Sequence, residues 1–455
     1  MPTWNSSTHP SWYCDASELA DLIRKKLVSP REIIEVLLER IRLLNPKINA
    51  MVTVMAEQAM QRAIEAERSV ASGEALGPLH GVPFTIKDTF DTAGILTTRG
   101  SKLYQDCVPT ENAEAVNRFI HAGAIPLAKT NVPEFAAWFE TDNLVIGRTN
   151  NPWDLERTPG GSSGGESAAI AAGMSPIGIG SDVGISVRGP AAFTGIVALK
   201  ATHGNIPLTG HFPPIATRFW HVGPMARSVR DVALGYRLLS ECIEDPINAT
   251  NVVRVGWTSA AFGPVDREVA GAVAEAAALL VDAGFDVAET ELVFMAKRDW
   301  LSVFTTLWSA EMIPFVQRIS RGRESELHAI GAGLAAATPP SQSDVSDAEV
   351  ALSELKAFFS AYFLDYDVLL CPVNPIAAPR HAKRQLDVDG ALLPAANVMR
   401  MTSPFNLTGH PALSIPTGMT SSGLPLSVQL IARPNDEATI LRLGALLEKS
   451  SGLKT

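Results

Sequence analysis

The stretch from Thr158 to Phe193 reads TPGGSSGGESAAIAAGMSPIGIGSDVGISVRGPAAF and contains two turns rich in glycine and serine. Between the turns, ESAAIAAG favours a short helix and SPIGIGSD favours a strand. The first turn holds Ser162 within GGSSG, which fits the G-x-S-x-G pattern of a hydrolase nucleophile elbow. The second turn ends at Ser186, 24 residues further along the chain. Each of these two serines is therefore a candidate nucleophile.

The residues before Ser162 argue against a nucleophile elbow at that position. An elbow follows directly on a buried hydrophobic strand, whereas Ser162 follows NNPWDLERTPG, which is polar and interrupted by proline. A phosphate-binding loop also fails, because no lysine follows Gly165. For the glycine run taken alone, a flexible loop over the start of a helix is the plain alternative.

The second turn offers a run of successive backbone N–H groups beside Ser186. Such groups can point into one concavity and bind an oxyanion. The predicted donors are Val183, Gly184, Ile185 and Ser186. On either side of this turn lie Asp182 and Arg188, for which we expect a mutual ion pair that braces the loop rather than direct contact with a substrate.

A candidate base lies upstream, in GPLHGVPFTIKDTF (residues 77–90). Its apolar residues alternate with the others at a strand period, which places Thr85 and Lys87 on one face and Asp88 on the opposite face. A lysine can accept a proton only when it is neutral, so its pKa must fall by several units from about 10.4. Burial on this apolar strand would lower the pKa of Lys87 in that way.

Taken together, these motifs resemble the signature of the amidase signature family. The resemblance extends in order along nearly the whole chain and includes LHGVPFTIKD (79–88), AKTNVPEFA (128–136), GPMARSVRD (223–231) and the segment 405–443 that begins FNLTGHPALSIPTG. It implies an α/β/α fold in which helices flank a large central mixed β-sheet. It also implies hydrolysis of a C–N acyl bond with no cofactor.

The resemblance assigns a Ser–cis-Ser–Lys triad to three residues of this chain. Lys87 falls on the lysine of the family, Ser162 on the relay serine that carries the cis peptide bond, and Ser186 on the nucleophile. A relay serine suits amide cleavage, because it can return a proton to the leaving amine.

The chain departs from the family where it carries Ile185 in place of the usual glycine. An isoleucine still supplies its N–H, but its β-branched side chain adds bulk beside the nucleophile. We therefore expect Ile185 to reshape the acyl pocket, with Gly189 as the residue that makes room for it.

The segment NIPLTGHFPPIATRFWHVGP (205–224) is less similar to the family, and we interpret it as a lid or pocket wall, with an ordinary surface loop as the alternative. The substrate pocket is predicted to include the aromatic residues Trp138, Phe139, Phe219 and Trp220. Phe304 and Trp308 lie at helical spacing, which is more typical of a core than of a pocket.

The substrate stays open at this stage among an amide, an anilide and a carbamate (urethane). Two alternatives are also open: the A subunit of a glutamine-dependent tRNA amidotransferase, and an esterase of the α/β-hydrolase type with Ser162 as nucleophile and His203 or His410 as base. A binding module that has lost its chemistry is disfavoured, since all three triad residues are present.

Composition narrows the class of protein. The chain has 455 residues with a net charge of −10 and no cluster of Lys or Arg, which argues against nucleic acid and membrane partners. No C-x-x-C or HExxH motif points to a metal. No signal peptide is evident, so we expect a cytoplasmic protein. In that reducing compartment we expect single buried thiols at Cys14, Cys107, Cys242 and Cys371. We expect a monomer or homodimer that acts on a small molecule.

The order of the predicted elements indicates one domain over residues 1–455. Its predicted parts are an N-terminal helical segment (about 15–75), the signature core (about 80–235), a peripheral helical and βαβ segment (about 250–345) and C-terminal strands with a last helix (about 350–450). Within these parts the pattern predicts a helix over 53–71, a short helix in NVPEFAAWF (131–139) and a loop over 338–349.

Overall fold

A single large sheet organises the molecule. The computed structural model describes residues 13–241 and 253–450, and an 11-stranded sheet runs through it in the order β1-β3-β2-β4-β6-β5-β12-β13-β9-β7-β8. These strands are β1 (Met51–Val54), β2 (Pro83–Lys87), β3 (Ile125–Thr130), β4 (Ile177–Asp182), β5 (Val197–Lys200), β6 (His221–Ala226), β7 (Arg254–Trp257), β8 (Asp286–Glu289), β9 (Val368–Pro372), β12 (Ala412–Met419) and β13 (Pro425–Ala432). All four predicted parts of the chain therefore contribute strands to one sheet.

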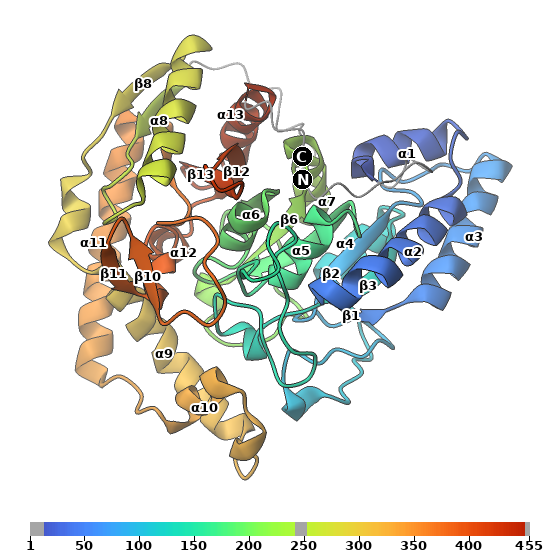
Figure 1. Cartoon of the computed structure of the whole chain (residues 1–455), viewed down its shortest axis with the longest axis horizontal. Coiled ribbons are helices and arrows are strands. Elements are labelled where there is room, and N and C mark those ends of the chain that lie inside the picture. Colours follow the sequence, from blue (N-terminus) through green and yellow to red (C-terminus); the bar gives the residue numbers. More distant parts are fainter. Residues whose placement is uncertain (1–12, 242–252, 451–455) are drawn as a thin grey trace.

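The sheet mixes parallel and antiparallel pairs. β2 runs parallel to both β3 and β4, and β7 runs parallel to both β8 and β9. The pairs β4–β6, β5–β6, β5–β12 and β12–β13 are antiparallel. Helices lie around the sheet (Figure 1), which confirms the predicted α/β fold with a large mixed sheet flanked by helices.

The helices lie around the two ends and the centre of the sheet. α2 and α3 lie side by side near β1, α9 and α11 lie side by side at the other end, and α5 and α6 occupy the middle of Figure 1. The helices are α1 (Ala16–Arg24), α2 (Pro30–Ile48), α3 (Ala56–Ser72), α4 (Glu114–His121), α5 (Gly164–Ala171), α6 (Arg188–Thr194), α7 (Val229–Ser240), α8 (Arg267–Asp282), α9 (Trp300–Ile319), α10 (Ala329–Ala336), α11 (Gln342–Asp365), α12 (Ser403–Thr408) and α13 (Glu437–Ser450). A small separate hairpin joins β10 (Gln385–Val388) to β11 (Ala391–Pro394).

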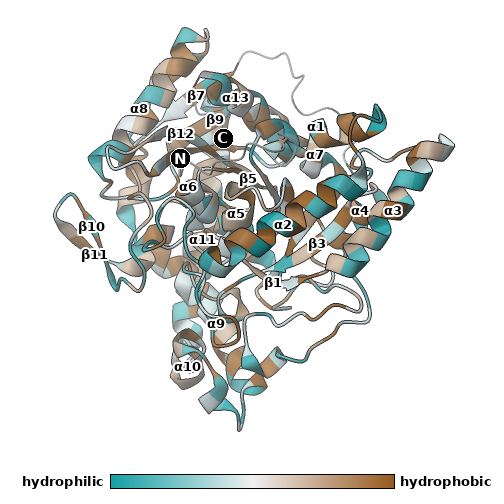
Figure 2. Cartoon of the chain, turned by 45° about the vertical axis from the view of Figure 1, so that its right-hand side comes forward, coloured by the Kyte–Doolittle hydropathy of each residue, from teal (hydrophilic) through white to brown (hydrophobic). Residues whose placement is uncertain are grey.

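α2 shows how local sequence fixes an element. Ser29 and Glu32 form a capping box at its start, and Pro30 occupies the first turn, where its missing N–H costs no helical hydrogen bond. Hydrophobic and hydrophilic residues alternate along α2 in Figure 2, so the helix buries one face, which includes Ile34 and Leu37, against the rest of the protein.

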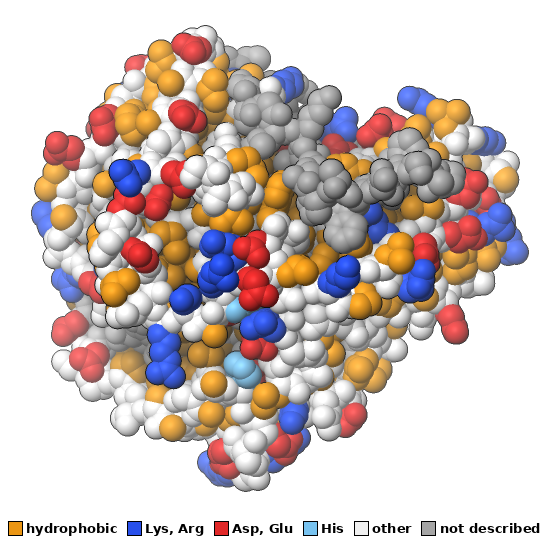
Figure 3. All heavy atoms as spheres, viewed as in Figure 1, with side chains coloured by type: hydrophobic (Ala, Val, Ile, Leu, Met, Phe, Trp, Pro, Cys, Tyr) orange, Lys and Arg blue, Asp and Glu red, His pale blue; other side chains and the backbone are white. Residues whose placement is uncertain are grey.

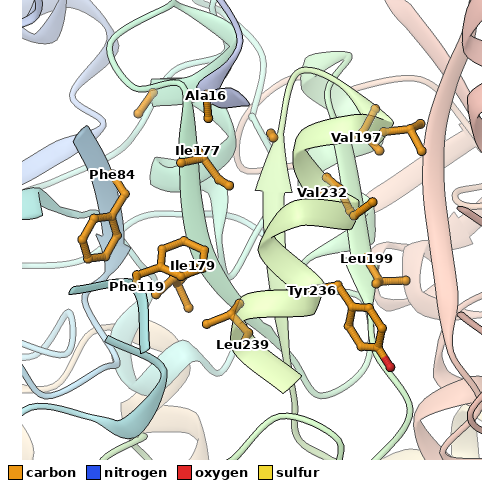
Figure 4. Close-up of a cluster of buried hydrophobic side chains, with 14 of the residues drawn as sticks. Ala16, Phe84, Phe119, Ile177, Ile179, Val197, Leu199, Val232, Tyr236 and Leu239 are labelled. Carbon is orange, nitrogen blue, oxygen red and sulfur yellow. The ribbon is translucent and has the colours of Figure 1, made fainter. Parts of the chain in front are cut away.

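The core beneath the site is apolar and closely packed. Figure 4 shows Phe84 of β2 beside Phe119 of α4, whose ring centroids are 5.2 Å apart, and Ile177 and Ile179 along β4. α7 covers the neighbouring strands with Val232 among other side chains. This packing holds β2 and β4 rigidly next to each other, so side chains at their ends have fixed positions.

One predicted boundary and two predicted elements differ from the structure. The helix expected over 53–71 is present as α3, but it begins only at Ala56, because residues 51–54 pair with β3 as an edge strand. The loop expected over 338–349 contains the start of α11, where Ser341 and Asp344 form a capping box within a polar stretch. The helix expected in NVPEFAAWF is only a short 3-10 turn, Glu134–Ala136, inside which Phe135 has a φ of 57°.

The cysteines and the apolar helices add two observations. Cys242 lies outside the described residues, and no disulfide joins Cys14, Cys107 and Cys371. Cys371 is buried as expected, whereas Cys14 and Cys107 are only partly buried, contrary to the expectation. No helix within residues 13–241 or 253–450 combines the length and the apolar character that crossing a membrane requires.

Candidate active site

The candidate base, Lys87, ends β2 and is completely buried. Its Nζ lies 2.8 Å from Ser162 Oγ, 2.9 Å from the carbonyl oxygen of Ser181 and 3.0 Å from Ser181 Oγ. Ser162 stands in the turn just before α5, and the peptide bond between Gly161 and Ser162 is cis. The structure therefore brings the predicted lysine and the predicted relay serine into direct contact.

Burial sets the charge state of Lys87. Loss of solvation lowers the pKa of its amino group from 10.5 to about 7, against the opposing influence of the carboxylates of Asp182 and Glu166. A lysine with this pKa is largely neutral at slightly alkaline pH and can accept a proton there. Asp88 turns away from this group, as predicted, and its Oδ1 lies 3.4 Å from Lys129 Nζ on the other side of the strand.

The candidate nucleophile, Ser186, occupies the turn that joins β4 to α6 and is 4% exposed. The N–H of Ser163 donates to the carbonyl of Ser186 at 3.1 Å, so the two serine turns are tied together next to Ser162. Among the described residues no hydrogen bond joins the hydroxyls of Ser162 and Ser186 to each other. Catalytic hydrogen bonds are often long before a substrate binds, so this geometry is compatible with a relay.

The predicted oxyanion hole is a turn of buried backbone donors. Within the described parts of the chain, the N–H groups of these residues donate to no acceptor: Val183, Gly184, Ile185 and Ser186. Buried N–H groups nearly always have a partner, so a run of unpaired ones indicates a place where an external acceptor binds.

Asp182 and Arg188 form the predicted ion pair. Arg188 Nε and Nη2 lie 3.1 Å from the two carboxylate oxygens of Asp182, and both side chains are fully buried. Burial alone would raise the pKa of Asp182, but the charge and hydrogen bonds of Arg188, with the N–H of Val187, hold it well below its ordinary value. Asn406 completes the brace by accepting from Arg188 and donating to Asp182.

Ile185 and Gly189 fit each other as the sequence suggested. A Cβ at Gly189 would lie 2.5 Å from Cγ1 of Ile185, a separation that atoms do not tolerate. The isoleucine side chain therefore occupies the space that a larger residue at 189 would need.

The four predicted pocket aromatics divide into two groups. Phe139 is buried in a cluster with Ile185, and the half-buried Trp138 lies beside it with a ring-centroid distance of 4.4 Å. Trp138 also lines an open cavity of about 520 Å³. Phe219 and Trp220 are buried in another apolar cluster, which also contains Val183.

The aromatics of α9 also approach the turn. Phe304 is 3% exposed and packs so closely on Gly184 that a Cβ there would lie 3.0 Å from Cζ of the ring. Trp308 is only partly buried and packs at the edge of two apolar clusters.

The histidines required by the esterase alternative are engaged elsewhere. His203 bonds to the carbonyl of Thr217 at 3.0 Å, and His410 bonds to the hydroxyl of Thr408 at 2.7 Å. The described residues 141–161, which precede Ser162, form no strand beyond a single bridge at Arg157. A nucleophile elbow with a histidine base is therefore disfavoured at Ser162.

Three buried groups near Lys87 were missed by the sequence reasoning. Ser181 contacts Lys87 directly, and His211 Nε2 lies 2.9 Å from Ser181 Oγ. Glu166 accepts hydrogen bonds from the hydroxyls of Thr85 and Thr130, and burial raises its pKa to about 7. The strand period of SPIGIGSD could have flagged Ser181, but no local signal links residue 211 to this site.

Metal ligands are not grouped in the described part of the chain. Within residues 13–241 and 253–450, His, Cys, Asp and Glu side chains nowhere form a group of three or more that could hold a metal ion.

Comparison with known proteins gives a consistent result. A family model described as Amidase matches residues 32–441. The A subunit of the glutamyl-tRNA(Gln) amidotransferase of Moorella thermoacetica is 34% identical, over 97% of this chain and 97% of that protein. The acylamidase of Rhodococcus erythropolis is 34% identical, over 96% of this chain and 95% of that protein. The crystal structure of a bacterial aryl acylamidase of the amidase signature family superposes with a TM-score of 0.89, at 25% identity, over 98% of both chains.

Proposed function

Because this chain belongs to the amidase signature family, we propose that it is a serine hydrolase that cleaves C–N acyl bonds through an acyl-enzyme. The observation that carries this proposal is the contact of 2.8 Å between the buried Lys87 and Ser162. A buried lysine in contact with a serine, with no described carboxylate in contact with it, is the arrangement that a neutral base requires.

The proposed reaction begins with proton transfer. Lys87 takes the proton of Ser162, Ser162 takes the proton of Ser186, and Ser186 Oγ attacks the substrate carbonyl carbon. The carbonyl oxygen becomes an oxyanion, which the unpaired N–H groups of the turn after β4 stabilise. Ser162 then gives a proton to the nitrogen as the C–N bond breaks, and it takes a proton back from Lys87. The amine leaves, and Lys87 is neutral again.

Water completes the cycle. It attacks the acyl carbon of the Ser186 ester, its proton passes back through the same relay, and the acid leaves as Ser186 regains its hydrogen. The net reaction consumes one amide and one water and yields one acid and one amine, with every proton accounted for.

For the substrate, we propose an aryl amide or a carbamate with a modest acyl group. Ile185 directly precedes the nucleophile in the chain and packs in one apolar cluster with Phe139, and we propose that its side chain narrows the pocket for the acyl group. Trp138 and Phe139 lie next to it, and aromatic rings of this kind bind flat apolar groups. The acylamidase relative and the aryl acylamidase structure support this choice by their names.

A second candidate function is the A subunit of an amidotransferase, which the relative from Moorella thermoacetica favours. A protein of that kind works together with partner chains and takes ammonia from glutamine. We propose instead that the chain acts by itself on a small molecule.

A substrate panel separates these possibilities. The purified chain is incubated with 4-nitroacetanilide, hexanamide, ethyl N-(4-nitrophenyl)carbamate and glutamine, with Ser186→Ala as the control. We expect hydrolysis of the anilide or carbamate by the wild type and none by the control. The proposal would be contradicted if the wild type hydrolysed only glutamine. It would also be contradicted if the wild type hydrolysed none of the four compounds unless partner chains were added.

A further inference from the structure

We propose that His211 is a positioning residue that aims the lone pair of Lys87 at Ser162. This inference rests on the proposed function, in which Lys87 is the base. It comes from a continuous polar chain: His211 Nε2 lies 2.9 Å from Ser181 Oγ, which lies 3.0 Å from Lys87 Nζ, which lies 2.8 Å from Ser162 Oγ.

The hydrogens of Lys87 limit which bonds it can form. A neutral amino group has two N–H bonds and one lone pair, and here it faces three oxygen atoms. The carbonyl oxygen of Ser181 can only accept, so one N–H points to it. The other N–H and the lone pair are shared between the hydroxyls of Ser181 and Ser162. Only a lone pair directed at Ser162 can act as the base.

The single proton of the Ser181 hydroxyl decides between the two arrangements. If that proton points to Lys87, it occupies the lone pair and Lys87 cannot take the proton of Ser162. If it points to His211, Ser181 Oγ accepts from Lys87 instead, and the lone pair is left for Ser162. Lys87 and His211 are the only described partners of Ser181 Oγ, so His211 makes the choice.

His211 can accept from Ser181 only when Nε2 carries no proton, which means a neutral ring with its hydrogen on Nδ1. Its surroundings favour the neutral form, because burial holds the pKa of His211 well below its ordinary value. The charge of Lys87, whenever that group is protonated, and the charge of Arg99 lower the pKa further. No described acidic side chain contacts the ring to oppose this.

Packing fixes the position of the ring. It lies edge-on to Phe90 at a centroid distance of 5.0 Å and against Trp220 at 4.7 Å. The next residue anchors the segment, since the N–H of Phe212 donates to the carbonyl of Thr89 at 2.8 Å. The segment 205–224, which we interpreted as a lid or wall, thus also delivers a buried group to the lysine.

The test measures how fast phenylmethanesulfonyl fluoride labels Ser186 from pH 6 to pH 9.5. His211→Phe keeps the ring but removes the acceptor, and we expect labelling 10- to 100-fold slower at every pH. His211→Gln restores an acceptor near Nε2, and its rate should lie within about threefold of wild type. His203→Phe alters an exposed histidine that does not contact Ser181, Lys87 or Ser162, and it should leave the labelling rate unchanged.

Several results would overturn the inference. One is a wild-type rate in His211→Phe. Another is a slow rate that recovers fully at high pH, because that would show an effect on the pKa of Lys87 rather than on its orientation. Failure of the wild type to label at all is a different outcome, and it would contradict the proposed function itself.

Two further measurements guard against misfolding. In a Ser181→Ala background, His211→Phe should change the labelling rate less than twofold, since the hydroxyl it orients is gone; an undiminished effect contradicts the proposal. The second measurement is ¹H–¹⁵N NMR of the wild type, in which the His211 signals are identified because they vanish in His211→Phe. These signals should show a proton on Nδ1 and none on Nε2, and a proton on Nε2 instead would refute the inference.

Discussion

Replacement of Lys87 by methionine should change how the stability of the protein depends on pH. The folded pKa of Lys87 is about 7 and its ordinary value is 10.5. Between these values the unfolded chain binds a proton that the folded chain does not, so the free energy of unfolding rises with pH. The Lys87→Met variant has no such group and lacks this rise.

The size of the effect follows from the two pKa values. Relative to an unshifted lysine, burial of Lys87 costs the folded state about 4 kcal/mol at pH 7 and about 2 kcal/mol at pH 9. Wild type should therefore gain about 2 kcal/mol over Lys87→Met between these pH values. Loss of the Lys87 charge also raises the pKa of Glu166 in the variant. A buried carboxyl with a raised pKa makes the variant less stable as the pH rises, so this effect also widens the difference between wild type and variant.

Urea unfolding at pH 7, 8 and 9, followed by tryptophan fluorescence, measures this difference. Lys25→Met is the matched control for the loss of a lysine, because Lys25 is exposed and lies outside the site. If wild type and Lys87→Met keep a constant difference in unfolding free energy from pH 7 to pH 9, Lys87 titrates as an ordinary lysine. The account of Lys87 as a neutral base would then be wrong.

Further predictions concern the pH dependence of the reaction rate, the packing of Ile185 against Gly189 and the ion pair between Asp182 and Arg188. The kcat/KM for the anilide should rise about tenfold per pH unit below pH 7 and level off above it, since Lys87 must lose its proton; a rate still rising at pH 9 contradicts this. Gly189→Ala should lower the free energy of urea unfolding by about 1–3 kcal/mol through its clash with Ile185, and Ile185→Gly should relieve that loss. Ile185→Gly should also favour bulky over short acyl groups, and unchanged selectivity on a pair of such anilides would show that Ile185 does not shape the pocket. Arg188→Met leaves Asp182 buried without its cation and should destabilise the protein by about 3–5 kcal/mol, which calorimetry would register as a lower Tm.

Local sequence patterns predicted the elements that carry their own signals. The alternation in VPFTIKD marked β2, whose residues are all buried, and placed Lys87 and Asp88 on opposite faces of the strand. Ser29 and Pro30 marked the start of α2. β1 was missed because an edge strand of four residues, with only Met51 fully buried, shows too little alternation to be recognised beside a strong helix.

The site was predictable only as far as its motifs reach. The glycine and serine turns indicated Ser162, Ser186 and the oxyanion donors, because turn chemistry is local. His211 could not be found in this way, since its role depends on a loop that tertiary packing brings against β2 and β4. The face of the molecule drawn in Figure 3 does not indicate the position of the site, because basic and acidic side chains are interspersed over it.

The central claim is that Ser186 attacks and Ser162 relays the proton. Phenylmethanesulfonyl fluoride reacts with activated serines, and mass spectrometry of the digested protein identifies the modified residue. The account predicts the label on Ser186 and no label in Ser186→Ala, whose Ser162 and Lys87 remain in place. A label on Ser162 in the wild type would contradict it.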